Sequence, residues 1–433
     1  MGEENCGAES RGHEAWLSGI LASDEFLEFV MRQLGSYQSR DSFLAQAMPC
    51  GLSPDLAWNL VALMRRVASR PTVGEVGRQM GALRGSHWRV PPDALEALNR
   101  IVAATSRTSE LWRDLKPLLE RGRYPQSLVT DLAAIAERGH LDVGYEDVRA
   151  LVLSERAPSN DDERLICNAR DILRDLGDYG GIPDGNDLES LYGRLTEGVG
   201  ARSQRRRALP ATPYPEFFEQ HRTLSFDEAA QLLYGPSAVA GHPLLDAFMA
   251  SGAIWSQWPF PHYNELMELI LRWMAFGNAD VPALRGVPFS KLRFDWERGM
   301  ADDSLVPYRY GEALVVSAFG VDATPYVEVM TRLTEEAVAR LCRDVAHLTA
   351  ESRGLADRIK EDWRLNDRQK QLLCAAVDDE ELKVDILSYA QLCNASPSTA
   401  RNDLSRLVQL GLCQMTLEGK KKVYRCLPGR REG

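Results

Sequence analysis

Polar and basic side chains close to the C-terminus are spaced so that they would share one side of a helix. Ser396 followed by Pro397 predicts the helix start, because serine caps helical amides and proline fits the first turn. Gly411 predicts its end. Small or apolar residues at three- and four-residue spacing would face a core, namely Ala400, Leu404, Leu407, Val408 and Gly411. The side chains left outside are of the types that bond base edges and phosphates, namely Ser398, Thr399, Arg401, Asn402, Ser405, Arg406 and Gln409.

A basic pair of strands is expected after this helix. The patterns of residues 412–415 and 423–427 predict two strands that are joined through Glu418, Gly419 and a run of lysines. From residue 396 to 433, eight Lys or Arg stand against three Asp or Glu, whereas the whole chain carries a net charge of −11. Positive charge is therefore concentrated where phosphate contacts would be made. The basic side chains expected to make them are Lys420, Lys421, Lys422 and Arg425.

The elements that would position these side chains form a small domain. Residues 387–393 predict a short helix, and residues 394–396 a tight turn into the next helix, which is the helix-turn-helix spacing. Residues 366–433 thus resemble the winged helix-turn-helix modules of bacterial regulators. The resemblance implies binding of double-stranded DNA, as a homodimer on adjacent half-sites. The alternative is a winged helix used only for protein contacts or dimerisation.

The composition is typical of a soluble globular protein and allows two to four domains in 433 residues. Charged residues interrupt the longest apolar runs, such as 266–276, which are shorter than the roughly 20 residues that a bilayer requires. Residues 1–9 are acidic and polar, unlike a secretory signal. We therefore expect a cytoplasmic protein with no membrane contact.

The eight cysteines lie far apart, with no C-x-x-C pair and no histidine at metal-binding spacing beside them. We expect reduced thiols that mostly fill the core, and neither a metal site nor a cofactor.

Helical periodicity dominates the chain before residue 410, and it predicts a mainly α fold. The patterns predict amphipathic helices over 25–34, 53–69, 92–104, 110–120 and 127–138, and a long polar helix over 335–362. Loops are expected at 181–186 and at 201–212, where four arginines gather. This arginine run indicates a solvated loop, and the alternative is a hairpin that faces phosphate. The four arginines are Arg202, Arg205, Arg206 and Arg207.

Four local patterns between residues 128 and 348 occur in the order found in one all-helical family. The run beginning at Asn168 resembles the first core helix, and residues 187–195 resemble the next. The run from His242 to Phe248 resembles the helix before the active-site loop, and the run from Asp322 to Val327 the start of a late core helix. The segment thereby resembles a Fic domain. Most members of that family transfer AMP from ATP to protein hydroxyls.

The catalytic motif is the part that departs from the family. There the loop reads His-Pro-Phe-x-x-Gly-Asn-Gly-Arg, in which histidine is the general base and the glycines and arginine hold phosphate. Here residues 258–266 read Trp-Pro-Phe-Pro-His-Tyr-Asn-Glu-Leu. Pro259, Phe260 and Asn264 persist. The base, both glycines and the arginine are replaced by Trp258, Tyr263, Glu265 and Leu266.

These replacements predict that ordinary AMP transfer is lost. Indole cannot accept a proton, and Glu265 brings a negative charge towards an anion. Loss of a general base costs about 10² to 10⁴ in rate. His262 could act as a substitute base, but it is expected to be a surface histidine, and Asn264 the N-cap of a helix. The family's inhibitory glutamate has a counterpart in Glu137, which we expect to be an exposed helix residue.

The sequence as a whole predicts four segments. They are a helical N-terminal extension (1–120), a degenerate Fic-like helical domain (121–350), a linker helix (351–365) and the winged helix-turn-helix (366–433). The expected function is a DNA-binding regulator whose Fic-like domain acts as a sensor or scaffold and is not an active AMP transferase. Two alternatives stay open: a nucleotidyl or other group transferase with a non-standard site, and a scaffold that binds a protein partner through its N-terminal extension.

Overall fold

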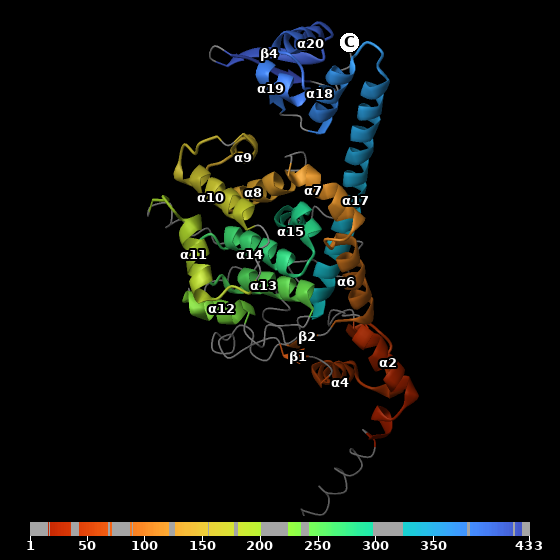
Figure 1. Ribbon diagram of the computed structural model, residues 1–433. Coiled ribbons are helices and arrows are strands. Elements are labelled where there is room, and N and C mark those ends of the chain that lie inside the picture. Colours follow the sequence, from red (N-terminus) through yellow and green to blue (C-terminus); the bar gives the residue numbers. More distant parts are fainter. Residues whose placement is uncertain are drawn as a thin grey trace, which may run out of the picture. The chain divides into compact units, whose positions relative to one another are not determined.

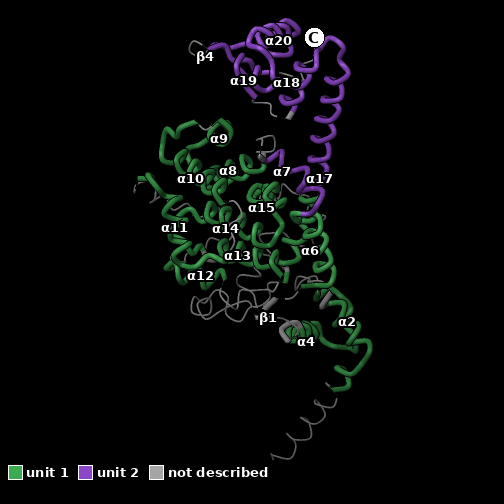
Figure 2. The backbone as a smooth tube through the Cα atoms, in the orientation of Figure 1, with its two compact units in different colours: residues 1–107, 127–338 green, residues 108–126, 339–433 purple. Residues whose placement is uncertain are grey.

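The structure is a computed structural model in which two compact units are distinguished (Figures 1 and 2). Unit 1 comprises residues 1–107 and 127–338, and unit 2 comprises residues 108–126 and 339–433. The structure describes residues 16, 18–35, 43–67, 70–71, 87–88, 90–120, 126–154, 156–176, 181–200, 224–234, 242–297, 324–378, 382–418 and 421–426. The arginine-rich loop expected at 201–212, the N-terminal nine residues, Asp322 and Lys420 lie outside them. The four-segment division made from the sequence stays a prediction.

The first helices of unit 1 have a small core of their own. They are α2 (Asp24–Gly35), η1 (Pro49–Gly51) and α4 (Pro54–Val67). Phe26 and Phe43 are fully buried between them, and the rings of Phe43 and Trp58 meet edge to face. A two-stranded antiparallel ladder, which the sequence pattern did not predict, pairs β1 (Arg70–Pro71) with β2 (His87–Trp88).

The rest of unit 1 is a bundle of helices arranged around α14 (Asn264–Asn278). Most residues of α14 are buried on every side, which is the signature of a central helix. The helices around it are α6 (Pro92–Thr105), α8 (Gln126–Arg138), α9 (Tyr145–Leu153), α10 (Asp161–Asp175), α11 (Gly185–Leu195), α12 (Phe226–Tyr234), α13 (Pro243–Gln257), η3 (Pro282–Gly286) and α15 (Phe289–Glu297). An ion pair of 2.8 Å between Arg100 and Glu335 joins α6 to α17 (Thr324–Glu361).

Unit 2 combines helices with a small antiparallel sheet. Its elements are α7 (Glu110–Glu120), the C-terminal part of α17, α18 (Asp367–Asp378), β3 (Lys383–Val384), α19 (Ile386–Leu392), α20 (Pro397–Gln409), β4 (Cys413–Glu418) and β5 (Lys421–Cys426). The strands pair in the order β3-β5-β4. We call residues 366–426 the C-terminal module. The protein is therefore mainly α, with a small three-stranded sheet at its C-terminal end.

The predicted helices agree with the observed ones to within a few residues, except that α17 begins at Thr324, eleven residues before the expected start at 335. Two positions of the predicted inward stripe were assigned wrongly, because Val408 of α20 and Gly411 just after the helix are both exposed. Val408 is 37% exposed, whereas Ala400, Leu404 and Leu407 are fully buried. The inward stripe of the helix includes Asp403, which the apolar pattern could not indicate. The loop expected at 181–186 is shorter, since α11 already begins at Gly185.

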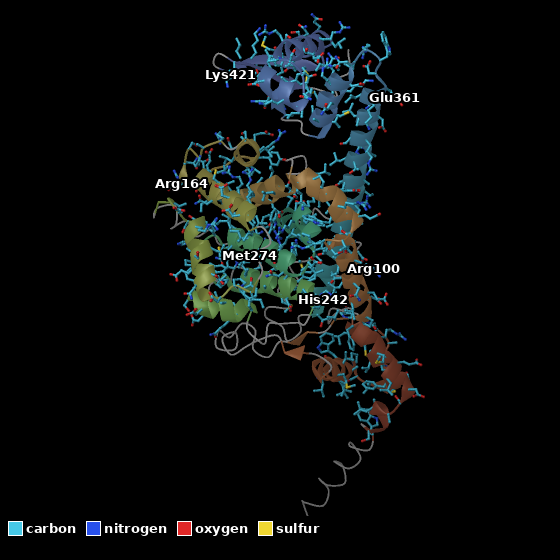
Figure 3. The ribbon with its side chains drawn as sticks, viewed as in Figure 1. Arg100, Arg164, His242, Met274, Glu361 and Lys421 are labelled. Carbon is cyan, nitrogen blue, oxygen red and sulfur yellow. A yellow bond between two sulfur atoms is a disulfide. The ribbon has the colours of Figure 1, made fainter. Side chains whose placement is uncertain are left out.

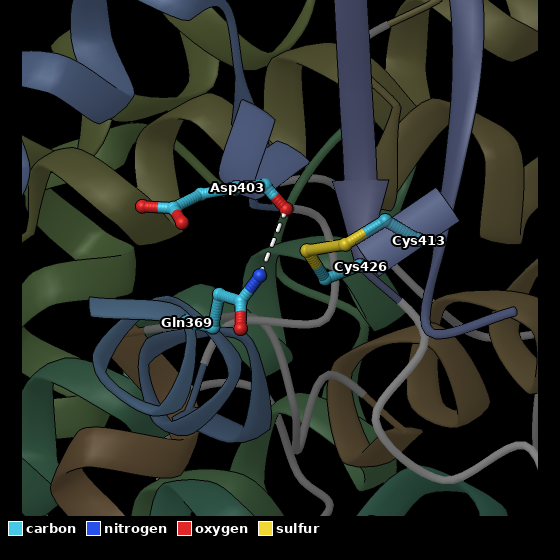
Figure 4. The surroundings of a disulfide bond; sticks show 4 residues. All are labelled: Gln369, Asp403, Cys413 and Cys426. Carbon is cyan, nitrogen blue, oxygen red and sulfur yellow. Dashed lines mark hydrogen bonds between the residues drawn. A yellow bond between two sulfur atoms is a disulfide. The ribbon is translucent and has the colours of Figure 1, made fainter. Parts of the chain in front are cut away.

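The expectation of reduced thiols is wrong for one pair of cysteines. Cys413 of β4 and Cys426 of β5 form a disulfide (Figure 4). The two residues face each other in the β4–β5 register, which brings their Cα atoms to 3.9 Å. The sequence separation of 13 gives no hint of this pairing, because it depends on the strand register. Cys50, Cys167, Cys342, Cys374 and Cys393 are not in disulfides.

Candidate functional site

The start of α20 is fixed by a hydroxyl cluster. The Ser396 hydroxyl caps the helix by accepting a hydrogen bond from the Thr399 amide at 3.2 Å. The same hydroxyl lies 2.9 Å from the hydroxyls of both Ser398 and Thr399. Ser398 and Thr399, predicted to contact nucleic acid, thus also serve the cap. Gly411 ends the helix region with φ +72°, a conformation that glycine adopts without strain.

Asp403 connects α20 to the two preceding helices. Its carboxylate accepts hydrogen bonds from the Asn366 amide and the Arg368 guanidinium, each at 2.8 Å, and from the Tyr389 hydroxyl at 3.4 Å. The Gln369 side chain donates to the Asp403 carbonyl at 3.1 Å (Figure 4). The Asp403 side chain is 8% exposed. The apolar pattern did not indicate an inward role for Asp403, and a lone acid between inward positions of an otherwise basic helix is the signal that could have identified it.

The outer face of α20 carries no acidic side chain. Five of the predicted nucleic-acid contacts are exposed on this helix: Ser398, Arg401, Asn402, Ser405 and Arg406. The one carboxylate of the helix, that of Asp403, is buried and paired with Arg368. The face therefore presents positive charge and amide and hydroxyl groups, which suit phosphate and base edges.

The basic residues of β5 alternate between the two faces of the sheet. Tyr424 and Cys426 are buried against the helices, and because side chains alternate along a strand, Lys422 shares their face. Lys421 and Arg425 therefore belong to the opposite face. Lys421 and Lys422 are exposed and Arg425 is half-buried. The predicted basic cluster is thus divided.

The loop that aligns with the catalytic motif is closed on itself. Trp258 (φ 47°) ends α13 and Tyr263 (φ 56°) precedes α14, both in the left-handed region. The Trp258 indole N–H donates to the Trp255 carbonyl at 3.1 Å. Leu224, which lies outside the loop, holds it in place, since the Leu224 amide donates a hydrogen bond to the Pro259 carbonyl at 3.1 Å. Phe260 is 2% exposed and belongs to the core.

Asn264 is not the N-cap that the sequence suggested, because Tyr263 occupies the cap position. The Asn264 side chain instead forms two hydrogen bonds of 3.0 Å with the backbone of Phe260. Both ends of its amide are thereby used inside the loop. His262 is half-buried, with its ring 6.0 Å from that of Tyr263, and is not the surface residue that was expected. Glu137 is exposed on α8, as expected.

An ion pair and a set of aromatic rings fill the space behind the loop. The Glu265 carboxylate lies 3.9 Å from the Arg138 guanidinium, and both side chains are at most 14% exposed. Arg138 also packs on the rings of Trp255 and Phe294, at 5.3 and 4.7 Å. Arg293 stacks on the Trp255 ring. These contacts place two cations beside apolar rings, where each guanidinium gains cation–π stabilisation.

A second buried ionic group lies along α14. Arg272 pairs with Asp131 of α8 at 3.2 Å and with Glu268 at 3.6 Å. Asp131 also accepts hydrogen bonds from the Ser290 and Lys291 amides at 2.9 and 3.1 Å. Burial raises the pKa of Asp131 to about 7, although Arg272 and the two amides oppose the rise. The group fixes α8, α14 and α15 to one another.

The described part of the chain contains neither a metal-binding cluster nor a membrane span. No group of three or more His, Cys, Asp or Glu side chains is placed there to hold a metal ion. None of the helices in those residues is both long and apolar enough to cross a membrane.

The chain was also compared with known proteins. No protein-family model matches it, and no curated protein matches it. Among solved structures, it is similar to the crystal structure of a Fic family protein from Desulfovibrio desulfuricans G20. The two chains are 16% identical, with a TM-score of 0.43, over 84% of this chain and 99% of that chain. At this identity and TM-score the likeness does not establish a family.

Proposed function

We propose that the protein is a DNA-binding regulator in the cytoplasm, in which a catalytically silent Fic-like body acts as a sensor or scaffold. The observation that carries the proposal is the outer face of α20, where Arg401, Asn402 and Arg406 are exposed while Asp403 is buried and neutralised. A helix with this face is suited to the major groove of duplex DNA.

The arrangement of the C-terminal module supports a winged helix-turn-helix. Its elements follow one another as helix, strand, helix, helix, strand, strand, and its sheet has the order β3-β5-β4. A turn of four residues, 393–396, separates α19 from α20. In such a module the second helix of the pair contacts base edges and the β4–β5 hairpin acts as the wing.

The contacts of the central loop support a body that transfers no AMP. The resemblance to Fic domains implies a histidine base, free backbone amides for phosphate and an arginine, and this loop has Trp258, an internally bonded Asn264 and buried Leu266 instead. In the family an inhibitory glutamate pairs with the motif arginine. Here Leu266 stands in place of that arginine, and the ion pair that forms nearby joins Arg138, the residue after Glu137, to Glu265 in the first turn of α14.

We further propose that two copies bind together. One module of this size makes few phosphate contacts, and two modules on adjacent half-sites would raise the affinity through the second, intramolecular contact. The large N-terminal extension would then be available for a protein partner.

The experiment selects binding sites from a random duplex library with the full chain, and then measures affinity by fluorescence anisotropy. Arg401, Asn402 and Arg406 are changed one at a time to Ala. Each change is expected to lower the preference for the selected sequence over single-base variants, because a good bidentate contact discriminates by about 1–3 kcal/mol. The matched control is Arg353→Ala, an exposed arginine on α17. Absence of any enriched sequence, or a preference that none of the three variants alters, would refute base recognition by α20.

A further inference from the structure

The hairpin of β4 and β5 is closed by a covalent bond at its base. Cys413, the first residue of β4, is paired in register with Cys426, the last residue of β5, and the two form a disulfide (Figure 4). The ladder runs from this pair to Glu418 and Lys421, and Figure 3 labels Lys421. The disulfide therefore lies at the end of the ladder opposite to the basic residues of the hairpin.

Apart from its first residue, strand β4 buries little side-chain surface. Residues 414–417 are all exposed. Met415 and Leu417 share the face of the buried Cys413, because side chains alternate along a strand, but they are 42% and 67% exposed. Among the described strands β4 pairs with β5 and lies at the edge of the sheet. Apolar contacts therefore hold most of this strand weakly.

Strand β5 is anchored independently of the disulfide. Its residues Tyr424 and Arg425 pair with Val384 and Lys383 of β3, and Tyr424 is buried in the core of the module. This support reaches only the base of the hairpin, and a two-stranded hairpin by itself is marginally stable in water. The disulfide thus ties the weakly held strand to the anchored one.

A disulfide at this position has a chemical consequence in the cytoplasm, where the proposed function places the protein. Thiol reductants keep most cysteines reduced there, and the disulfides that do form are usually redox-sensing or catalytic. Cys413 and Cys426 are at most 3% exposed, so a small thiol reaches the sulfur atoms only when the hairpin opens. Because the strand register keeps the two residues opposite each other, their thiols are placed to form the bond again after reduction.

We infer that Cys413 and Cys426 are a redox couple that controls the rigidity of the β4–β5 hairpin. For oxidation, one cysteine thiolate attacks a small disulfide such as oxidised glutathione and releases one small thiol. The second thiolate then attacks the mixed disulfide and releases the other. The protein thereby loses two electrons and two protons, which the small disulfide gains as two thiols. In the dithiol form no cross-link constrains the open hairpin, so opening becomes more frequent.

The couple regulates the proposed function, and this part of the inference rests on that function. Lys421 and Lys422 are exposed on the hairpin. A hairpin that opens more often presents these lysines to phosphates for a smaller fraction of the time, which lowers the affinity for duplex DNA and its dependence on salt. The disulfide form is therefore the form with the higher affinity.

The first experiment determines the state of the pair in the folded full chain. The protein is equilibrated with excess dithiothreitol or with excess oxidised glutathione, quenched in acid, alkylated in denaturant and mapped by peptide mass spectrometry. Cys413 and Cys426 are expected to be alkylated in the first sample and joined in the second. A pair that stays joined in dithiothreitol, or that is still alkylated after oxidised glutathione, would overturn the inference.

Hydrogen exchange tests the effect on the hairpin. Amides of β4 and β5 are expected to exchange at least about tenfold faster in the dithiol form, whereas those of α18 should exchange equally in both forms. The double variant Cys413→Ala with Cys426→Ala should behave like the dithiol form in both solutions. Its control is Cys342→Ser, a half-buried cysteine of α17 outside any disulfide, which should retain the difference. Equal exchange of the hairpin in the two forms of the parent, a comparison that needs no variant, would also overturn the inference.

Anisotropy of a labelled duplex then compares the two forms of the parent. The dithiol form is expected to bind at least about threefold more weakly and with a smaller salt slope. Equal affinity and equal slope would contradict the regulatory role of the couple. A chain that binds no duplex in either form refutes the proposed function, whereas hydrogen exchange of the hairpin still decides the inference.

Discussion

Lys421 and Lys422 are sequence neighbours, but strand alternation assigns them to opposite faces of the sheet. Lys422 shares the face of the buried Tyr424 and Cys426, which is also the side of α20. The pKa of Asp385 is lowered mainly by the hydrogen bond from the Ser388 amide, and the nearby charge of Lys421 also contributes. Positive charge at Lys421 is therefore partly offset. Nucleic acid held against α20 should contact Lys422 more closely than Lys421.

This difference predicts unequal effects of two alanine variants. Lys422→Ala should reduce the slope of log affinity against log salt by about 0.9, the value for one lost phosphate contact, and Lys421→Ala should change it less. The measurement is anisotropy of a labelled duplex between 50 and 200 mM salt, with Arg353→Ala as the charge-matched control. Equal slopes for the two lysine variants would show that the assignment of faces does not govern binding.

Asp131 gives the body a specific pH dependence. Its pKa is about 7 in the folded protein because it is buried, and about 3.9 when unfolded. Between these values the folded state holds the proton more tightly, so the free energy of unfolding should fall as pH rises from about 4 to about 7, by at most about 1.4 kcal/mol per pH unit. Above pH 7 this contribution is lost.

Denaturant unfolding at a series of pH values compares the parent with Asp131→Asn. The variant should show a flatter fall between pH 4 and 7, whereas Asp55→Asn, an exposed control, should follow the parent. If Asp131→Asn and the parent have parallel stability profiles, the Asp131 carboxyl does not titrate in this window.

At the scale of elements, Asp403 decides how α20 is held. Its carboxylate joins α20 to Asn366, Arg368 and Tyr389, so the helix is positioned by hydrogen bonds as well as by Leu404 and Leu407. Removal of a hydrogen-bonded charge of this kind costs about 1.5–3 kcal/mol. Asp403→Ala should therefore accelerate hydrogen exchange of the α20 amides by roughly tenfold or more. Glu361→Ala, an exposed acid at the end of α17, is the control and should leave that exchange unchanged.

The same elements show which structural features could be predicted from the sequence and which could not. Capping serine, first-turn proline and apolar spacing located α20 correctly, because these signals are local. The Cys413–Cys426 disulfide, strand β3 and the inward position of Asp403 depend on contacts between distant residues, and no local pattern indicates them. In the central loop, the motif comparison singled out residues 258–266, and the loss of catalysis there stays a prediction. It could not indicate that Arg138 faces Glu265 or that Asn264 bonds back to Phe260.

At the scale of the whole molecule, the proposed function gives the body and the C-terminal module separate roles. We expect that the body labels neither itself nor bacterial lysate proteins with radiolabelled ATP. Trp258→His should not restore labelling, because Glu265 and Leu266 stand where the Fic motif has its phosphate-binding glycine and arginine. The measurement is autoradiography after incubation with α-labelled ATP, beside an active AMP transferase as a positive control. Labelling by the parent chain would contradict the proposal that the body transfers no AMP.

Binding of the full chain to its selected duplex, measured as a function of salt, tests the central claim most directly. We expect a specific affinity that falls steeply with salt. The double variant, Lys421→Ala with Lys422→Ala, should bind every duplex more weakly, with a slope reduced by up to about 1.8. Arg353→Ala combined with Arg358→Ala removes the same charge from α17 and should retain the slope. A chain that binds no duplex, or a double lysine variant with the slope of the parent, would contradict the account.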